Sequence, residues 1–171
     1  MPNRWNQQPD IVVETFTEGN PFSFLSNFYD GHPFTWRDLT FPTAEHAFVY
    51  AKLNLDRPDG NEYIRWILAT PTAGQVKRLG RKVPLREDWE TVKFDLMREI
   101  VWAKFSQNPD LAVLLCNTGD AYLQEGNTWN DTIWGVRLDS SVPWQNRVGE
   151  NMLGIILMET RAKLAAQTLQ P

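Results

Sequence analysis

Apolar residues recur at helical spacing along much of the chain. After Thr43, the residues Ala47, Phe48, Ala51 and Leu55 fall on one stripe of an α-helix. A threonine side chain accepts a hydrogen bond from the unpaired N–H groups that open a helix, so Thr43 is the expected N-cap. The pattern predicts a helix from Thr43 to about Leu55.

The next two helices are marked by their ends. Residues 61–69, NEYIRWILA, have a helical composition and predict the second helix. Thr70 and Pro71 follow as the expected N-cap and first residue of a third helix, and Gly80 is expected to end it.

The second half of the chain predicts three more helices. The longest apolar period spans residues 88–105 and follows an aspartate cap. Asn108–Pro109 repeats the pattern of a cap followed by proline and predicts a helix that ends near residue 119. A final apolar stripe predicts a helix over about residues 150–165.

Strand signals are fewer and shorter. Weak alternation predicts short strands or extended edges in residues 11–17, 121–126 and 132–138. Residues 21–36 are rich in Gly, Pro, Ser and Asn and predict a loop, which its four phenylalanines would pin to the core. We therefore expect a mainly α fold, α+β with a minor β element, as a single domain over residues 11–165. The ends, residues 1–10 and 166–171, are expected to be loose.

Composition limits the classes of protein that fit. With 171 residues, 42% hydrophobic and 22% charged, the chain is typical of one compact globular domain. No apolar run is long enough to span a membrane, and the N-terminus lacks a signal peptide, so a cytoplasmic protein without a membrane partner is expected. The net charge of −4 argues against a broad nucleic-acid coat, although it permits a local basic pocket.

Metal and familiar nucleotide sites are not indicated. One cysteine, Cys116, and two histidines exclude a disulfide and a cysteine-based zinc site and leave few metal ligands. The sequence contains no GxGxxG, GxxxxGK[ST], HExxH or GxSxG motif. We expect neither a metal nor a cofactor.

Glu45 is the first candidate for chemistry. It falls in the opening turn of a predicted helix, where the helix dipole favours a negative charge, so it could simply stabilise that helix. However, Glu45, Val49 and Lys52 share a helix face that is offset from the apolar stripe. That face could line a pocket anchored by the stripe.

Lys104 is the second candidate. It continues a ridge with Lys93, Met97 and Ile100 on the long helix and lies beside apolar positions. Such a lysine either extends its amine to water or remains desolvated. In a desolvated site its pKa falls, and the neutral amine becomes a nucleophile toward a carbonyl carbon.

A run of cations forms the third candidate. Residues 76–86 contain five basic residues and no acidic one: Lys77, Arg78, Arg81, Lys82 and Arg86. Such runs are often only solvated faces. In an acidic chain, next to Trp89, this run also suits a ligand that carries phosphates.

The fourth candidate lies in the C-terminal third. Asp131 and Trp134–Gly135 precede Gly149, Asn151 and Gly154. Glycines that open a helix let its backbone approach a ligand, and an asparagine can read a sugar hydroxyl or a base edge. The same pattern also fits tight helix packing with an asparagine cap.

Together these segments resemble the NADAR family, also called YbiA-like, over about residues 14–164. The resemblance is carried by the order and spacing of the following strings: FSFLSNFY, FPTAEHAFVYAK, ATPTAGQVKRLGRKV, DWETVKFDLMREIVWAKFSQNP, LLCNTGDAYLQEGN, DTIWG and GENMLG. It implies a small, mainly helical domain that hydrolyses an N-glycosidic bond.

The resemblance implies two possible substrates. One activity removes ADP-ribose from guanine bases of nucleic acid, which would be single-stranded or present a flipped base. The other cleaves phosphoribosylamino-pyrimidine intermediates of riboflavin synthesis. Both break the bond from ribose C1′ to an exocyclic amine. A pocket that binds NAD or ADP-ribose without turnover is an alternative of another class, and the oligomeric state stays open.

The resemblance also implies site residues. Glu45 matches the family's central glutamate, Asp131 its acidic residue before WG, and Lys104 and Lys52 two recurring lysines. The expected substrate-binding residues are Phe24, Ser26, Asn27, Phe28, Lys52, Lys77, Arg81, Trp89, Trp134, Gly135, Asn151 and Gly154.

Two routes are compatible with these residues. Glu45 would protonate the departing amine or assist ring opening, and Lys104 would form a Schiff base at C1′. Alternatively, water would attack C1′ directly, oriented by Glu45 or Asp131.

Overall fold

The computed structural model describes residues 11–168, so of the ends expected to be loose, residues 1–10 and 166–171, the parts 1–10 and 169–171 lie outside it. Contacts between residues divide the chain into two compact units. One unit is Asn27–Pro109, here called the central unit. The other, the terminal unit, combines the residues up to Ser26 with those from Asp110 onward.

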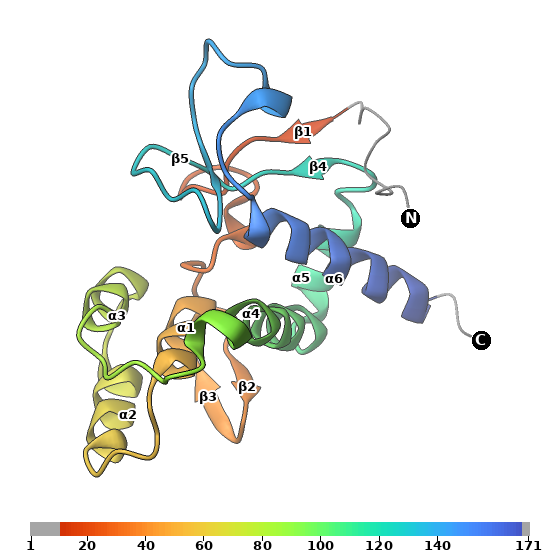
Figure 1. The fold of residues 1–171 in the computed structure, drawn as a ribbon. Coiled ribbons are helices and arrows are strands. Elements are labelled where there is room, and N and C mark those ends of the chain that lie inside the picture. Colours follow the sequence, from red (N-terminus) through yellow and green to blue (C-terminus); the bar gives the residue numbers. More distant parts are fainter. Residues whose placement is uncertain (1–10, 169–171) are drawn as a thin grey trace. The chain divides into compact units, whose positions relative to one another are not determined.

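Four helices and a hairpin form the central unit (Figure 1). They are β2 (Phe34–Trp36), β3 (Leu39–Phe41), α1 (Ala44–Lys52), α2 (Gly60–Ala69), α3 (Ala73–Leu79) and α4 (Trp89–Ser106). Helix α1 packs against α2, α3 and α4. Its apolar residues join a core cluster made of Val49, Leu53, Ile67, Val76 and Val83. Helix α1 therefore organises this unit.

Several helix ends follow the predicted punctuation, but α1 ends at Lys52 rather than near Leu55, and Asp88 stands at the N-cap position of α4 without a capping side-chain hydrogen bond. The Thr43 side chain accepts a hydrogen bond from the His46 N–H, as an N-cap does. Gly80 is the C-cap of α3, as expected. The predicted cap Thr70 is wrong: Thr72 caps α3 through the Gln75 N–H, and Thr70 instead ends α2.

His46 joins the start of α1 to the connection between α2 and α3. Its ring is fully buried, with Nε2 2.9 Å from the Thr70 carbonyl oxygen and Nδ1 2.8 Å from the Thr43 hydroxyl. A carbonyl can only accept, so Nε2 carries the proton and Nδ1 accepts from Thr43. Burial lowers the pKa of His46, and the bond to Thr70 opposes this shift only partly. The neutral imidazole is therefore the form that fits the fold.

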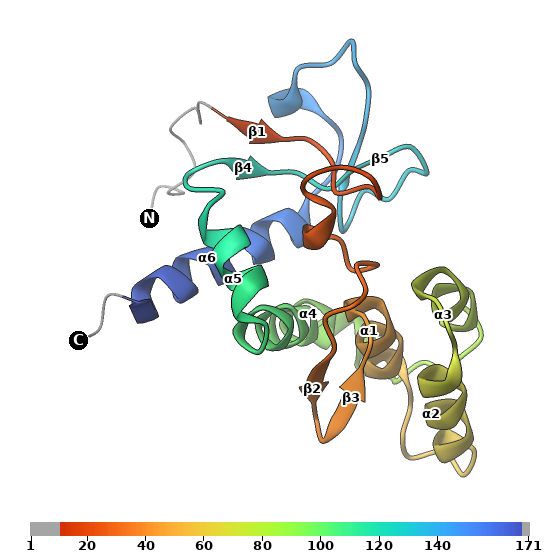
Figure 2. The ribbon, with the colours of Figure 1, turned by 180° about the vertical axis from the view of Figure 1, so that it is seen from behind.

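The hairpin β2–β3 was not predicted. Its strands pair antiparallel through Phe34–Phe41, Thr35–Thr40 and Trp36–Leu39. Arg37 and Asp38 form the turn with φ of 51° and 64°, a left-handed conformation that usually requires Gly or Asn. Figure 2 shows the hairpin beside α1 and α4, which it contacts.

Within the described residues, the terminal unit contains two α-helices and four short strands. They are β1 (Val12–Val13), α5 (Pro109–Cys116), β4 (Tyr122–Leu123), β5 (Gly126–Asn127), β6 (Val136–Arg137) and α6 (Met152–Thr168). Strand β1 pairs parallel with β4, and β5 pairs parallel with β6. Helix α6 packs on β4 and continues three residues beyond the predicted end at residue 165. Pro109 is the first residue of α5, as predicted.

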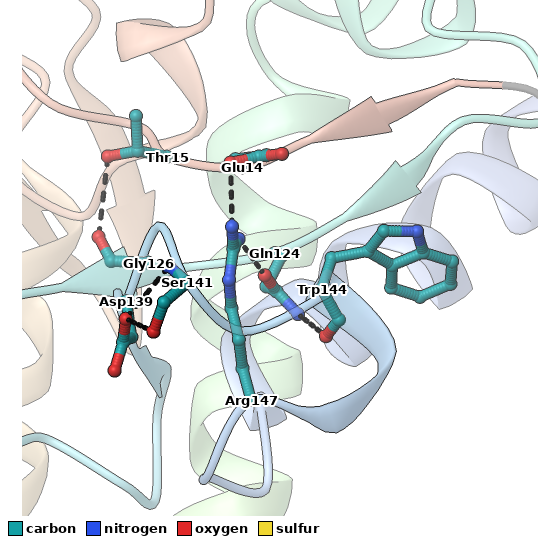
Figure 3. Close-up of polar contacts among 8 residues, drawn as sticks. All are labelled: Glu14, Thr15, Gln124, Gly126, Asp139, Ser141, Trp144 and Arg147. Atoms are coloured by element: carbon teal, nitrogen blue, oxygen red, sulfur yellow. Dashed lines mark hydrogen bonds and ion pairs between the residues drawn. The ribbon is translucent and has the colours of Figure 1, made fainter.

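A buried arginine holds the connection from β6 to α6. The Arg147 guanidinium, 6% exposed, donates to the Glu14 carboxylate at 2.9 Å and to Gln124 Oε1 at 2.8 Å (Figure 3). The Gln124 amide in turn donates to the Trp144 carbonyl at 3.1 Å. These bonds tie the connection to β1 and β4.

The helices and small sheets confirm the prediction of a mainly helical α+β fold. No helix within residues 11–168 is both long enough and apolar enough to cross a membrane.

The buried His46 makes the stability of the fold depend on pH. The unfolded chain binds a proton near pH 6.5, whereas the folded chain binds it only at lower pH because the pKa of His46 is lowered. The contribution is therefore present above about pH 6.5 and lost as pH falls, by at most about 1.4 kcal/mol per pH unit. Urea unfolding between pH 7.5 and 5 should show a steeper loss for the wild type than for His46→Gln. Equal slopes for both proteins would contradict this assignment.

Candidate functional site

Glu45 is held in the first turn of α1. Its side chain is 7% exposed. Its backbone N–H donates to the Asn27 carbonyl at 2.9 Å, while the Asn27 amide lies 3.6 Å from the Met97 sulfur on α4. The loop that begins at Asn27 is thereby fixed against both α1 and α4.

Lys52 is the last residue of α1. It lies seven positions after Glu45, which is about two helical turns, so both side chains share one face. The Lys52 Nζ is 4.8 Å from the centroid of the Phe48 ring and 5.8 Å from that of Trp89. These two rings pack at 5.1 Å from each other. Helix α4 therefore supplies the second aromatic face through its first residue.

Close packing at Gly80 brings two more cations to this face. A Cβ built on Gly80 would lie 2.7 Å from Val49 Cγ2, so the absence of a side chain lets the end of α3 approach α1. Lys77 and Arg81, on either side of Gly80, lie near enough to Lys52 to act on its pKa. The Lys77 Nζ is also 5.4 Å from the centroid of Phe28, a ring that is 42% exposed.

Burial lowers the pKa of Lys52 and is the largest cause of its shift. The Glu45 carboxylate opposes this shift, whereas the positive charges of Lys77 and Arg81 add to it. The net effect favours the neutral amine more than at an ordinary surface lysine. Glu45, Lys52, Lys77 and Arg81 thus form one interacting set, here called the α1 face.

Lys104 lies in the last turn of α4 and is 2% exposed. Its Nζ is 5.6 Å from the centroid of Tyr29 and 5.1 Å from that of Phe105. Of the two alternatives for this lysine, the structure therefore has the desolvated one. The loop Asn27–Tyr29 contacts Glu45 through Asn27 and Lys104 through Tyr29.

Asp131 stands in the terminal unit, where it organises its own loop. Its Oδ1 accepts hydrogen bonds from the N–H groups of Ile133 and Trp134 at 3.1 and 3.0 Å. The buried Asn127 side chain holds the same loop from both sides of Asp131, accepting from its N–H and donating to its carbonyl. These hydrogen bonds fix the turn formed by the DTIWG residues, so they account for Asp131 as a structural residue. A catalytic role for Asp131 stays a prediction.

Asn151 and Gly154 make contacts within the terminal unit as well. The buried Asn151 accepts from the Glu125 N–H and donates to the Leu123 carbonyl, both at 2.9 Å. A Cβ on Gly154 would lie 2.1 Å from the Leu123 oxygen. These contacts favour the alternative of tight helix packing.

The start of α6 does not offer its N–H groups to a phosphate. Met152 and Leu153 donate to the carbonyls of Ile133 and Trp134, and Asn151 donates to Gly135. Gly135 itself is packed against the Glu125 oxygen, which would lie 2.1 Å from an added Cβ. The expected backbone contacts of this region are thus already used by the fold.

The predicted residues divide between the two units. Asn27, Phe28, Glu45, Lys52, Lys77, Arg81, Trp89 and Lys104 belong to the central unit, and Phe24, Ser26, Asp131, Trp134, Gly135, Asn151 and Gly154 to the terminal unit. Phe24 is buried in the short 3₁₀ turn Ser23–Leu25, and Ser26 caps it.

Sequence reasoning missed the environment of Lys52. Phe48 was assigned only to the apolar stripe, yet it precedes Lys52 by four positions, a spacing that places two side chains next to each other on a helix. That spacing could have identified the pair. Tyr29 lies far from Lys104 in the sequence, so no helical spacing predicts the contact between its ring and the Lys104 amine.

The α1 face lies apart from two hollows that occur within the described residues. Within the described residues no three His, Cys, Asp or Glu side chains are placed to hold a metal ion. Shallow hollows occur between α5 and α6, beside Cys116, and between α2 and α3, beside Trp66. Both are lined mainly by apolar side chains, and neither includes Glu45 or Lys52.

Comparison with known proteins identifies the family. The NADAR domain matches residues 15–165. The chain belongs to the NADAR domain family. N-glycosidase YbiA of Shigella flexneri serotype 5b is 37% identical over 92% of this NADAR chain and 91% of its own length.

Two further relatives extend this result. The NMR structure of Escherichia coli YbiA matches with a TM-score of 0.78 and 31% identity, covering 96% of this chain and 90% of the solved one. The maize riboflavin biosynthesis protein PYRR is 28% identical over 90% of this chain but only 24% of its own length. The NADAR assignment and the enzyme class, a hydrolase of the N-glycosidase type, are thereby confirmed.

The contact at Gly80 predicts the behaviour of two alanine variants. Gly80→Ala forces a methyl group against Val49 and should destabilise the NADAR domain by about 1–3 kcal/mol, as overpacking does. Gly74→Ala is the matched control on the same helix, because an added Cβ there has no neighbour within 4 Å. It should stabilise α3 by roughly 0.5–1 kcal/mol. Urea unfolding of both variants measures the difference, and equal effects would refute the close approach of α3 to α1.

Proposed function

We propose that this NADAR protein hydrolyses the N-glycosidic bond between ribose C1′ and an exocyclic amine, and that it removes ADP-ribose from guanine bases of nucleic acid. The observation that carries the proposal is the α1 face. It places the buried acid Glu45 on the same helix face as Lys52, with Lys77 and Arg81 beside that lysine.

This arrangement matches the charges of a ribose phosphate. The leaving amine departs poorly as an anion, so an acid must protonate it or assist ring opening, and we assign this role to Glu45. Phosphates require cations, and arginine offers a forked pair of donors. We assign the sugar end to Glu45 and the phosphate end to Lys77 and Arg81. Glu45 and Lys52 leave the helix about 10 Å apart on one face, so their side chains can both reach a ribose C1′ that lies between them.

Aromatic side chains suit the base or adenine ring. Phe28 is 42% exposed beside Lys77, and we assign it to stacking against a planar ring of the substrate. Trp89 is buried against Phe48 and Lys52, which makes it a wall of the site. Phe24, Ser26, Trp134, Gly135, Asn151 and Gly154 stay predicted binding residues whose contacts in the structure are described above.

A second candidate substrate is a phosphoribosylamino-pyrimidine. It is favoured by the maize relative, which is named for riboflavin biosynthesis. The same acid and phosphate-binding cations serve this substrate, because the bond that breaks is of the same kind. The alternative of a binding pocket without turnover explains the cations but gives no use for a buried acid on the same face.

Two chemical routes lead to the products. In one, Glu45 or Asp131 orients a water molecule that attacks C1′ directly. In the other, a lysine amine replaces the base at C1′ and the resulting imine is hydrolysed. Lys104 and Lys52 are the candidate amines.

Substituting Glu45 tests the proposed function. Glu45→Gln keeps the shape of the side chain but cannot donate a proton as a carboxyl group does, so the rate should fall by about 10²- to 10⁴-fold. Release of ADP-ribose from a guanine-ADP-ribosylated oligonucleotide and release of ribose 5-phosphate from the phosphoribosylamino-pyrimidine measure the two activities.

Glu62→Gln is the matched control, because Glu62 also lies in the first turn of a helix but is exposed. It should react at the wild-type rate. A Glu45→Gln protein as active as the control, or a wild type inactive on both substrates, would overturn the proposed function.

A further inference from the structure

The two candidate lysines differ in how a substrate can reach them. Lys104 is 2% exposed, and its amine faces the rings of Tyr29 and Phe105. A nucleophile must touch the carbon that it attacks, so a substrate would have to displace these rings first. Lys52 is only half-buried, and part of its side chain is open to a ligand.

The position of the Lys52 amine is fixed by its surroundings. Phe48 and Trp89 present ring faces to it at 4.8 and 5.8 Å. Both rings belong to packed helices and are buried, so the amine has a defined place rather than the many rotamers of a surface lysine. Fixed geometry of this kind is what a reacting group needs.

The charges around Lys52 support a reactive amine. Burial and the cations Lys77 and Arg81 lower its pKa, against the opposing effect of Glu45. Only a neutral amine carries the lone pair that attacks carbon. Lys93, another lysine of the central unit, differs from Lys52 because it forms an ion pair with the carboxylate of Glu90.

We propose that Lys52, and not Lys104, is the amine that forms a covalent imine with ribose C1′ during turnover. This inference rests on the proposed N-glycosidase function. Lys104 then has a supporting role, because its buried amine packs under Tyr29 in the loop that also contacts Glu45.

The ribose ring opens to a C1′ imine with the base, and Lys52 Nζ adds to C1′. The bond from C1′ to the base nitrogen then breaks, and the base leaves as a neutral amine with a proton relayed through Glu45. Water adds to the remaining C1′–Nζ imine, the C1′–Nζ bond breaks, and the sugar aldehyde and the free lysine are released. No oxidant or reductant is consumed.

Imine formation can be tested apart from turnover. Ribose 5-phosphate is itself an aldehyde in its open-chain form, and sodium cyanoborohydride reduces the imine that it forms with an amine. Peptide mapping of the wild type at neutral pH should find the reduced adduct first at Lys52 among the six lysines of the chain. Preferential labelling of Lys104, or even labelling of all lysines, would overturn the inference.

The variant Lys52→Arg separates covalent chemistry from phosphate binding. Arginine keeps the positive charge and binds phosphate, but its guanidinium does not form the imine. The proposal expects a loss in kcat of roughly 100-fold or more with little change in KM. A rise in KM with kcat unchanged would mean that Lys52 only binds phosphate.

Lys82→Arg is the matched control in the same run of cations, because Lys82 is exposed and lies outside the proposed site. It should keep wild-type kinetics. Failure of the proposed function appears as a wild type without turnover, whereas failure of this inference appears as turnover that survives Lys52→Arg or as an adduct on another lysine.

Discussion

The close approach of α3 to α1 at Gly80 and Val49 is the contact on which the α1 face depends. Without a Cβ at Gly80, the end of α3 meets the methyl groups of a fully buried valine. Lys77 and Arg81 are then carried next to Lys52. His46 supports the same arrangement from the other end of α1, because its ring bonds to the connection that leads into α3. The grouping of charges on the α1 face therefore depends on the packing of α3 against α1.

The Glu45 carboxylate partly offsets the repulsion among Lys52, Lys77 and Arg81. Three cations near one another disfavour the charged state of the most buried one, Lys52, and Glu45 on the same helix reduces that effect. A phosphate bound to Lys77 and Arg81 would supply further negative charge and reduce the repulsion among the cations. The α1 face is thus electrostatically incomplete by itself, which is a property expected of a site for an anionic sugar.

Much of this fold could be predicted because its signals are local. The cap at Thr43, the stop at Gly80 and the start at Pro109 each depend on one or two residues. The hairpin turn at Arg37 and Asp38 was missed because it reaches left-handed backbone without Gly or Asn.

The site was predicted less completely than the fold. The residues around Lys52 come partly from two other helices, α3 and α4, which are distant in the sequence. For Asn151 and Gly154 the sequence pattern is the same for packing and for ligand binding, so the sequence alone does not distinguish the two.

The central claim is that a phosphorylated ribose binds on the α1 face. An NMR titration of the wild-type protein with ribose 5-phosphate tests it most directly, because each backbone amide reports on its own surroundings. The account predicts that chemical-shift changes concentrate at residues 27–29, 45–52 and 77–81. Changes confined to the hollow between α5 and α6, with these three segments unaffected, would contradict it.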